Sequence, residues 1–218
     1  MDNTSLTEFV TENGNIIKWL GHAGVEIINR ELNKVIYIDP WEINEKTPAD
    51  FILITHNHYD HLSIEDIKKI SKENTFIIAS SNCKDFLKGM NVMYVEEGDL
   101  VDLPEFTIEV VPAYNPNKDF HPKTYGGVGF IIDINNEKIY HAGDTDIIPE
   151  MDSFKVEIAL LPVGGKYTMN GEEAARAATK LGARTVIPIH YNKIVGTQQD
   201  VEALKKNFKG HVVVLQPV

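Results

Sequence analysis

The chain has 218 residues, of which 43% are hydrophobic and 24% are charged, a composition typical of globular proteins that excludes a largely disordered chain. Its 21 basic and 32 acidic residues give a formal net charge of −11, and a surface of that sign repels phosphate backbones, which disfavours a nucleic-acid partner. The single cysteine, Cys83, excludes an internal disulfide and disfavours a zinc site built on thiolates.

The N-terminal segment lacks the features of a targeting signal. Met1–Val10 has no basic region followed by an apolar run, as a signal peptide would have. No apolar stretch approaches the roughly 20 residues needed to cross a bilayer. We therefore expect a cytoplasmic protein without a membrane partner.

Short β-rich runs dominate the first part of the chain. Four of them predict strands between turns, at Ile16–Leu20, Val25–Ile28, Val35–Ile38 and Phe51–Ile54. A helix is expected after Ser63, which caps it, with Asp66 completing a capping box and Ile64, Ile67 and Ile70 forming the buried face. The half continues with a strand at Phe76–Ala79, a helix near Lys84–Lys88 and strands at Val92–Val95 and Phe106–Pro112.

A polar loop, Asn115 to Gly127, leads into a second half of similar organisation. Its expected elements, in chain order, are strands at Val128–Ile134, Lys138–His141 and Ile158–Leu161, a helix at Glu172–Leu181 stopped by Gly182, a strand at Thr185–Ile189, a helix at Asp200–Asn207 and a strand at Val212–Leu215. Each half runs from antiparallel strands into alternating strands and helices. This order favours an α/β (α+β) fold, a four-layer α/β/β/α sandwich. No linker separates the halves, so one domain over residues 1–218 is expected.

One segment concentrates metal-binding side chains, Thr55-His-Asn-His-Tyr-Asp-His61. Imidazole nitrogen and carboxylate oxygen are the ligands that zinc and similar divalent ions accept. On an extended segment His56 and His58 point to the same side, because side chains alternate with period two. The turn beyond them can present Asp60 and His61 from another direction. One short loop could therefore supply two adjacent metal positions.

The pattern His-x-His-x-Asp-His after a buried strand resembles the signature of the metallo-β-lactamase fold superfamily. Further segments agree with it in order and spacing: Trp19-Leu-Gly-His22-Ala-Gly, Ile38-Asp-Pro-Trp41, Ala142-Gly-Asp144-Thr and Pro188-Ile-His190-Tyr. The run Leu161-Pro-Val-Gly-Gly-Lys-Tyr-Thr-Met169, followed by Glu172-Glu-Ala-Ala, is similar to the branch that contains L-ascorbate-6-phosphate lactonase and predicted metal-dependent hydrolases. The resemblance covers nearly the whole chain and implies the four-layer fold.

The resemblance also implies a ligand set for two divalent ions, expected to be zinc, with manganese or iron as alternatives. It assigns His56 and His58 to the first ion. It assigns Asp60, His61 and His190 to the second ion, and Asp144 as the bridge between the two. The residues themselves support Asp144, which follows a strand and a glycine that permits a tight turn. They also support His190, which ends a β-rich run where α/β folds place ligands.

The chain departs from the family pattern at Asn115, where a third histidine for the first ion is usual. Asparagine offers only a neutral carbonyl oxygen. His121 stands six residues later in the same loop, and we expect it to fold back as the ligand, with Asn115 beside it. A weaker first position and a single-metal site are the alternatives.

The resemblance implies hydrolysis of a small lactone, ester or phosphorylated metabolite by a metal-activated water, with Asp60 also orienting that water. Lys166, in a Gly-Gly-Lys-Tyr loop, could hold an anionic group of the substrate or be an ordinary turn lysine. Tyr167 and Tyr191 could line the pocket or pack, and His22 could support a ligand or be structural.

Three other functions compete with a small-molecule hydrolase. A phosphodiesterase or ribonuclease of the same fold is disfavoured by the net charge of −11. A non-catalytic metal-binding protein is disfavoured because structural sites are closed and rich in cysteine. A di-iron redox protein would need a flavin domain, for which the chain has no room. The sequence names no substrate and is compatible with a homo-oligomer.

Overall fold

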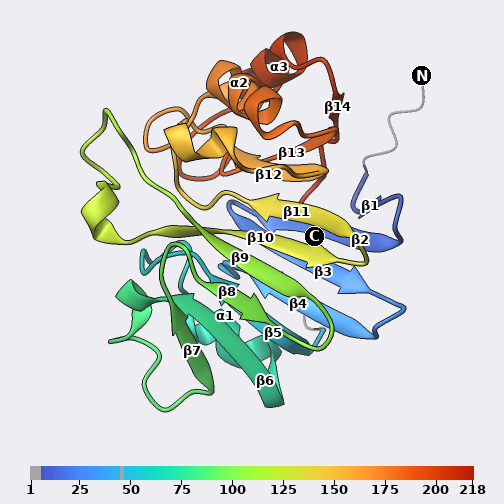
Figure 1. Ribbon diagram of the computed structural model, residues 1–218, viewed down its shortest axis with the longest axis vertical. Helices are drawn as coiled ribbons and strands as arrows, with labels where there is room; N and C mark the ends of the chain where they lie inside the picture. The colour runs from blue at the N-terminus through green and yellow to red at the C-terminus, as the bar shows by residue number, and fades with distance from the viewer. Residues whose placement is uncertain (1–5, 45–46) are drawn as a thin grey trace.

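A computed structural model describes residues 6–44 and 47–218, which form two seven-stranded mixed sheets (Figure 1). The first sheet follows chain order: β1 (Phe9–Val10), β2 (Asn15–Gly21), β3 (Gly24–Asn29), β4 (Lys34–Ile38), β5 (Ala49–Ile54), β6 (Ser71–Ser80) and β7 (Val92–Val95). The second sheet also follows chain order: β8 (Leu100–Asp102), β9 (Thr107–Pro112), β10 (Val128–Ile134), β11 (Glu137–His141), β12 (Ile158–Pro162), β13 (Thr185–Ile189) and β14 (His211–Val212).

The two sheets repeat one topology. In each, the first three strand pairs along the chain are antiparallel and the next three are parallel. Helices connect several of the parallel strands: α1 (Ile64–Ile70), α2 (Gly171–Leu181) and α3 (Gln198–Asn207). Short 3-10 turns complete the described elements: η1 (Ser81–Cys83), η2 (Lys123–Tyr125) and η3 (Pro149–Asp152). The expectation that each half runs from antiparallel strands into strands joined by helices is confirmed, and the later strands pair in parallel.

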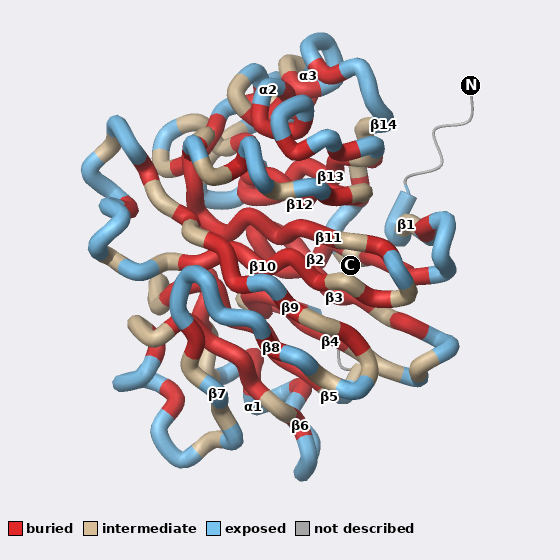
Figure 2. The backbone as a smooth tube through the Cα atoms, viewed as in Figure 1, coloured by how far each residue is buried: buried red, intermediate tan, exposed pale blue. Residues whose placement is uncertain are grey.

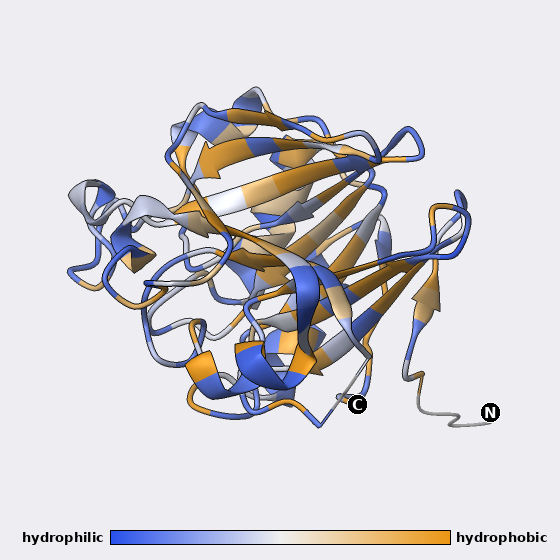
Figure 3. Cartoon of the chain, turned by 90° about the horizontal axis from the view of Figure 1, so that it is seen from below, coloured by the Kyte–Doolittle hydropathy of each residue, from blue (hydrophilic) through white to orange (hydrophobic). Residues whose placement is uncertain are grey.

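Apolar side chains from both sheets form one large buried cluster. It joins residues such as Ile17 and Ile27 of the first sheet to Phe130 and Ile132 of the second. Buried strands occupy the middle of the molecule (Figure 2), and they are mostly hydrophobic whereas the connecting loops are largely hydrophilic (Figure 3). This arrangement is what the hydrophobic effect predicts for two sheets that each have an apolar face.

Helices cover the two outer faces. The apolar face of α1 packs on the first sheet in a second cluster that includes Ile67, Ile70 and Ile52. On the other side α2 and α3 pack together, and their buried residues join the main cluster. The four-layer α/β/β/α order is therefore confirmed. Within the described ranges, no helix is both long and apolar enough to cross a membrane.

Helix ends follow the expected chemistry with one exception. Ser63 Oγ accepts a hydrogen bond from the Asp66 backbone N–H at 3.2 Å, as a cap should. The Asp66 carboxylate accepts from the backbone N–H of Glu42 at 2.8 Å, so it ties the preceding loop to α1 where a capping box was expected. Gly182 ends α2 with φ 69°, the left-handed conformation in which glycine is favoured.

The helix expected near Lys84–Lys88 is wrong, because these residues form turns after η1. A five-residue segment is too short to offset the cost of helix nucleation, and Leu87 is its one side chain in the buried core. Other differences lie at strand ends. β6 begins at Ser71, earlier than its apolar run, and β14 ends at Val212. The two- and three-residue strands β1 and β8 were not expected.

Candidate metal centre

The predicted ligands all follow the ends of strands at one edge of the two sheets. The His56–His61 loop leaves β5, Asp144 follows β11, and His190 follows β13. His121 comes from the long loop between β9 and β10. Strands that run in the same direction end at the same edge, which is why residues so far apart in the chain meet there.

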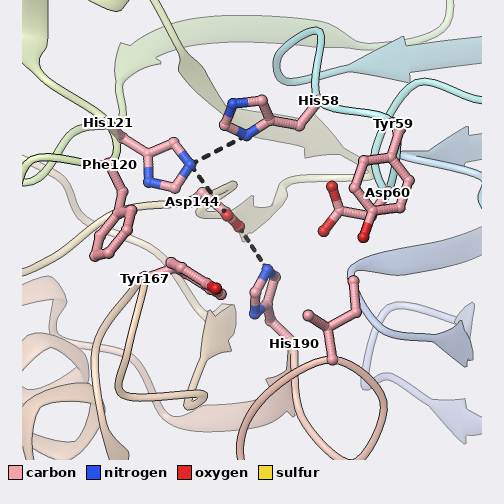
Figure 4. Close-up of a pocket in the computed structure, with 9 residues that line it drawn as sticks. His58, Tyr59, Asp60, Phe120, His121, Asp144, Tyr167 and His190 are labelled. Carbon is pink, nitrogen blue, oxygen red and sulfur yellow. Dashed lines mark hydrogen bonds and ion pairs between the residues drawn. The ribbon is translucent and has the colours of Figure 1, made fainter.

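Three histidines form a first cluster of possible ligand atoms. His58 Nδ1 lies 3.0 Å from His56 Nε2 and 3.3 Å from His121 Nε2. Asp144 Oδ2 lies 3.4 Å from that same His121 nitrogen. Figure 4 shows His58, His121 and Asp144 converging on the cavity from different loops.

A second cluster lies on the other side of the same carboxylate. Asp144 Oδ1 is 3.3 Å from His61 Nε2 and 3.2 Å from His190 Nε2. The possible ligand atoms of Asp60 and His22 and those of His61 and His190 all lie within 4.8 Å of one another. Asp144 therefore directs one oxygen toward each cluster, which is the geometry of a carboxylate placed between two cations.

These residues fit a metal by two independent observations. Nitrogen and oxygen atoms bound at about 2.0–2.1 Å to a common ion lie roughly 3.0–3.4 Å apart for octahedral to tetrahedral angles, and the separations in both clusters are 3.0–3.4 Å. In addition, His61 Nε2, His190 Nε2 and Asp144 Oδ1 are buried without a hydrogen-bond partner among the described residues. Buried polar atoms rarely stay unsatisfied, so this donor set suits divalent cations.

A carboxylate behind the clusters orients two of the histidine rings. His61 Nδ1–H donates to Asp39 Oδ2 at 2.7 Å, which leaves Nε2 free to face Asp144. The hydroxyl of Thr55 donates to the same Asp39 oxygen at 2.6 Å, so its oxygen can accept from His56 Nδ1–H at 3.0 Å. Such outer partners fix the tautomer and orientation of metal-binding histidines.

Asn115 supports His121 in a comparable way. Its side-chain oxygen accepts from the Nδ1–H of His121 at 2.9 Å and from the backbone N–H of His121 at 3.0 Å. The backbone N–H of Asn115 donates to the carbonyl of His121 at 2.7 Å. The loop thus folds back as expected, and Nε2 of His121 is the atom that faces the first cluster.

His22 supports Asp60 from the β2–β3 turn. Burial lowers the pKa of His22 to about 4 despite the neighbouring Asp60, so the ring is neutral and its Nε2–H donates to Asp60 Oδ2 at 2.9 Å. The carbonyl of His22 accepts from the backbone N–H of His190 at 2.7 Å. One turn therefore holds two residues of the second cluster.

Electrostatics keep the first cluster neutral and the carboxylates ionised. Burial lowers the pKa of His56, His58 and His121, because it disfavours the imidazolium form. Burial would raise the pKa of Asp144, but the nearby histidines outweigh it and hold that pKa well below the ordinary value. Asp60 follows the same pattern, with His22 lowering its pKa. Neutral imidazole and carboxylate are the forms that bind metal.

Backbone strain is concentrated at this edge. His22, Asp39 and His190 have φ of 49°, 46° and 59°, a conformation that ordinary residues avoid and that often marks functional sites. Gly143, just before Asp144, has φ +61°, and a Cβ there would lie 2.8 Å from the carbonyl oxygen of Val128. The tight glycine turn expected before Asp144 is confirmed.

A cavity of about 280 Å³ opens onto both clusters. Its described lining residues are His58, Tyr59, Asp60, Phe120, His121, Asp144, Tyr167, His190 and Ile194. The structure does not bring Tyr191 to this lining, because its ring is buried and stacks on Trp19 with centroids 4.7 Å apart. Lys166 is exposed, with its ammonium 4.8 Å from the centre of the Tyr167 ring.

The sequence singled out the ligand candidates but missed most of their support. Asp39 and Thr55 lie within the quoted segments, yet only the fold shows that Asp39 contacts the ring of His61 and the hydroxyl of Thr55, and that Thr55 contacts the ring of His56. Tyr167, which the sequence left open as a pocket or packing residue, does line the cavity. Phe120 gave no periodic signal, because it lies in an irregular loop.

Comparisons with known proteins agree with this geometry. A family model described as a beta-lactamase superfamily domain matches residues 16–190. A protein named UPF0173 metal-dependent hydrolase, from Caldivirga maquilingensis, is 36% identical over 207 residues, which cover 87% of each chain. One of the same name from Methanosphaera stadtmanae is 34% identical over 218 residues, covering 90% of this chain and 92% of the relative.

Solved structures share the fold. A crystal structure of a protein from Parabacteroides distasonis is 34% identical, with a TM-score of 0.82 over 96% of this chain and 98% of the other. Igni18, a metallo hydrolase from Ignicoccus hospitalis, is 26% identical, with a TM-score of 0.77 over 92% and 94% of the two chains.

Proposed function

Because the chain belongs to the metal-dependent hydrolases of the β-lactamase superfamily, we propose that it hydrolyses a small lactone, ester or phosphorylated metabolite at a centre of two divalent ions. Zinc is the proposed metal, and manganese or iron would suit the same ligands. The observation that carries the proposal is the pair of ligand clusters that share the Asp144 carboxylate and open onto one cavity. A cytoplasmic location is part of the proposal.

The proposed ligands divide between the two positions. His56, His58 and His121 would hold the first ion. The second would be held by His61 and His190, with Asp60 beside them, and Asp144 would bridge both. Bound divalent ions lower the pKa of a water molecule to about 7 and polarise the oxygen of the attacked group.

A side chain of the protein can orient the attacking water by accepting a hydrogen bond from it. Asp60 lines the cavity, and the hydrogen bond from His22 to its Oδ2 fixes the carboxylate. Its pKa is lowered by His22 and by the neighbouring His61, against the effect of burial. The carboxylate therefore stays ionised and can accept a hydrogen bond from the attacking water, which orients it. This is the catalytic role that we propose for Asp60.

The decisive experiment is turnover by the zinc-loaded protein of three probes: δ-valerolactone, 4-nitrophenyl acetate and bis(4-nitrophenyl) phosphate. We expect hydrolysis of the lactone or the ester, its loss on chelation and its return with added zinc. His58→Ala should lower kcat/KM by about 100-fold or more, because it removes a proposed ligand. His211→Ala, which alters an exposed histidine on β14, is the matched control and should leave kcat/KM unchanged.

Turnover that persists after complete removal of metal would contradict the proposal. Hydrolysis of the phosphodiester alone would favour the phosphodiesterase alternative instead.

A further inference from the structure

The cavity at the metal centre has two chemically different walls. Five of its lining residues belong to the two clusters, whereas the others form an apolar rim: Tyr59, Phe120, Tyr167 and Ile194. Figure 4 shows the rings of Phe120 and Tyr167 beside His121 and the ring of Tyr59 beside Asp60. The ring of Phe120 meets Tyr167 edge-on at 4.6 Å, so two loops jointly present an aromatic surface.

The rim is unusually exposed for apolar side chains. Tyr59 is 67% exposed, Phe120 is 45% exposed and Ile194 is 39% exposed. Scattered surface hydrophobes need no explanation, but several gathered around one functional cavity mark a binding surface. A ligand that covered them would gain from removing apolar area from water.

No lysine or arginine is among the described residues that line this cavity. The nearby lysines lie outside this lining. Lys166 is exposed, and its ammonium lies 4.8 Å from the centre of the Tyr167 ring. The ammonium nitrogen of Lys118 lies 2.5 Å from Asp146 Oδ1 and donates to the carbonyl of Thr168 at 2.6 Å. Lys193 is 2.7 Å from a carboxylate oxygen of Glu42.

A negatively charged group held inside the cavity against Phe120 and Ile194 would therefore lose its hydration without gaining an ionic partner from the lining side chains, which is costly. The overall charge of −11 would also disfavour its approach. An uncharged, apolar group avoids both penalties.

We infer that the substrate is an uncharged ester or lactone that carries one small apolar group, an inference that rests on the proposed function. The reacting carbonyl would face the ligand clusters, and the apolar group would lie against Phe120, Tyr167 and Ile194. The cavity volume of about 280 Å³, at about 30 Å³ per water molecule, holds the equivalent of roughly nine waters. That is room for a carbonyl group and one ring or short alkyl chain. A neutral substrate thus replaces the anionic one that Lys166 suggested from sequence.

The reaction itself is simple hydrolysis. The oxygen of water forms a bond to the carbonyl carbon, and the bond from that carbon to the ester oxygen breaks. One proton of the water goes to the leaving oxygen, which becomes an alcohol, and the other is released to solvent as the acyl product ionises to a carboxylate. In a lactone both groups remain in one ring-opened molecule. No oxidant, reductant or further reactant is needed.

The test compares two esters that share one reacting group, methyl phenylacetate and methyl 4-carboxyphenylacetate. We expect kcat/KM of the zinc-loaded protein to be about 10- to 100-fold higher for the neutral ester, since the added carboxylate would be buried without a partner. The corresponding N-methyl amides give a readout that needs no turnover. By calorimetry, the neutral amide should bind with the lower Kd.

Variants locate the preference on the rim. Phe120→Ala should lower kcat/KM for the neutral ester by about fivefold or more, because it removes apolar contact area. Ile194→Lys should reduce the difference in kcat/KM between the neutral and the carboxylated ester. Phe86→Ala is the matched control, because Phe86 is 52% exposed and lies outside the cavity lining. If the Phe120→Ala variant does not fold, Phe120→Leu replaces it in the same comparison.

Equal or better turnover of the carboxylated ester would overturn this inference and leave the proposed function standing. If neither ester is hydrolysed, the amide pair still decides the inference, and the three probes described above decide the proposed function. Tighter binding of the carboxylated amide would overturn the inference.

Discussion

At the scale of single residues, the pairing of Asn115 with His121 is the most informative feature. The side-chain oxygen of Asn115 accepts hydrogen bonds from both the ring and the backbone N–H of His121. A neutral oxygen that would be a weak zinc ligand thus positions the ring of His121, the proposed ligand. The sequence predicted this exchange from the position of His121 in the loop. The hydrogen bonds that make it work depend on how that loop closes, which no local pattern reveals.

His121→Ala and Asn115→Ala should therefore differ in their effect on metal binding. His121→Ala is expected to reduce the metal content from two ions to one, because it removes a proposed ligand. Asn115→Ala should keep two ions but weaken the affinity of one by about 10- to 100-fold, as is typical for loss of an outer partner. Elemental analysis after dialysis measures the number of bound ions, and competition with a chelator measures their affinity. Unchanged stoichiometry and affinity in His121→Ala would contradict this assignment.

At the scale of elements, most strands could be predicted because their residues are apolar on both faces or alternate in a regular way. Prediction failed where tertiary contacts decide the outcome. The polar start of β6 looks like a loop, and it is a strand only because Ser71 pairs with Ala49 of β5. The segment Lys84–Lys88 has helix-forming residues but too little apolar surface to hold a helix.

The turn after β11 should tolerate no side chain at position 143. Gly143→Ala would meet both the strain of a positive φ, about 1–2 kcal/mol, and a Cβ contact of 2.8 Å with the Val128 carbonyl oxygen. Gly89→Ala is the matched control, since Gly89 has φ +83° and no atom within 4 Å of a built Cβ. In urea denaturation, Gly143→Ala should lower the free energy of unfolding clearly more than the control does. An equal loss in the two variants would show that the contact is relieved by small shifts.

At the scale of the whole molecule, the candidate site is a product of both sheets. The contiguous His56–His61 segment could be recognised from sequence alone, because its ligand atoms lie within six residues. Asp144 after β11 and His190 after β13 became visible through the family resemblance, whereas His121 was inferred from its position in the loop that departs from the family pattern. His22 and Asp39 needed the fold, since their contacts join residues 38 and 22 positions apart in the chain.

Removal of metal should therefore lower the stability of the whole protein. An ion present at about 1,000 times its Kd adds roughly 4 kcal/mol to the folded state. For a chain of this size that corresponds to a fall in Tm of about 8–16 °C on chelation. Differential scanning calorimetry with and without EDTA measures the shift, and His58→Ala should show a smaller one. No change in Tm on chelation would mean that the folded chain holds no tightly bound ion.

The repeated topology of the two sheets has a consequence for the order of assembly. Each ligand cluster takes side chains from both halves of the chain: His56 and His58 with His121, and His61 with Asp144 and His190. Neither half alone presents a full set of donors. Capture of the proposed ions would then require that one half is docked on the other, and a chain whose halves had not docked would lack a complete site.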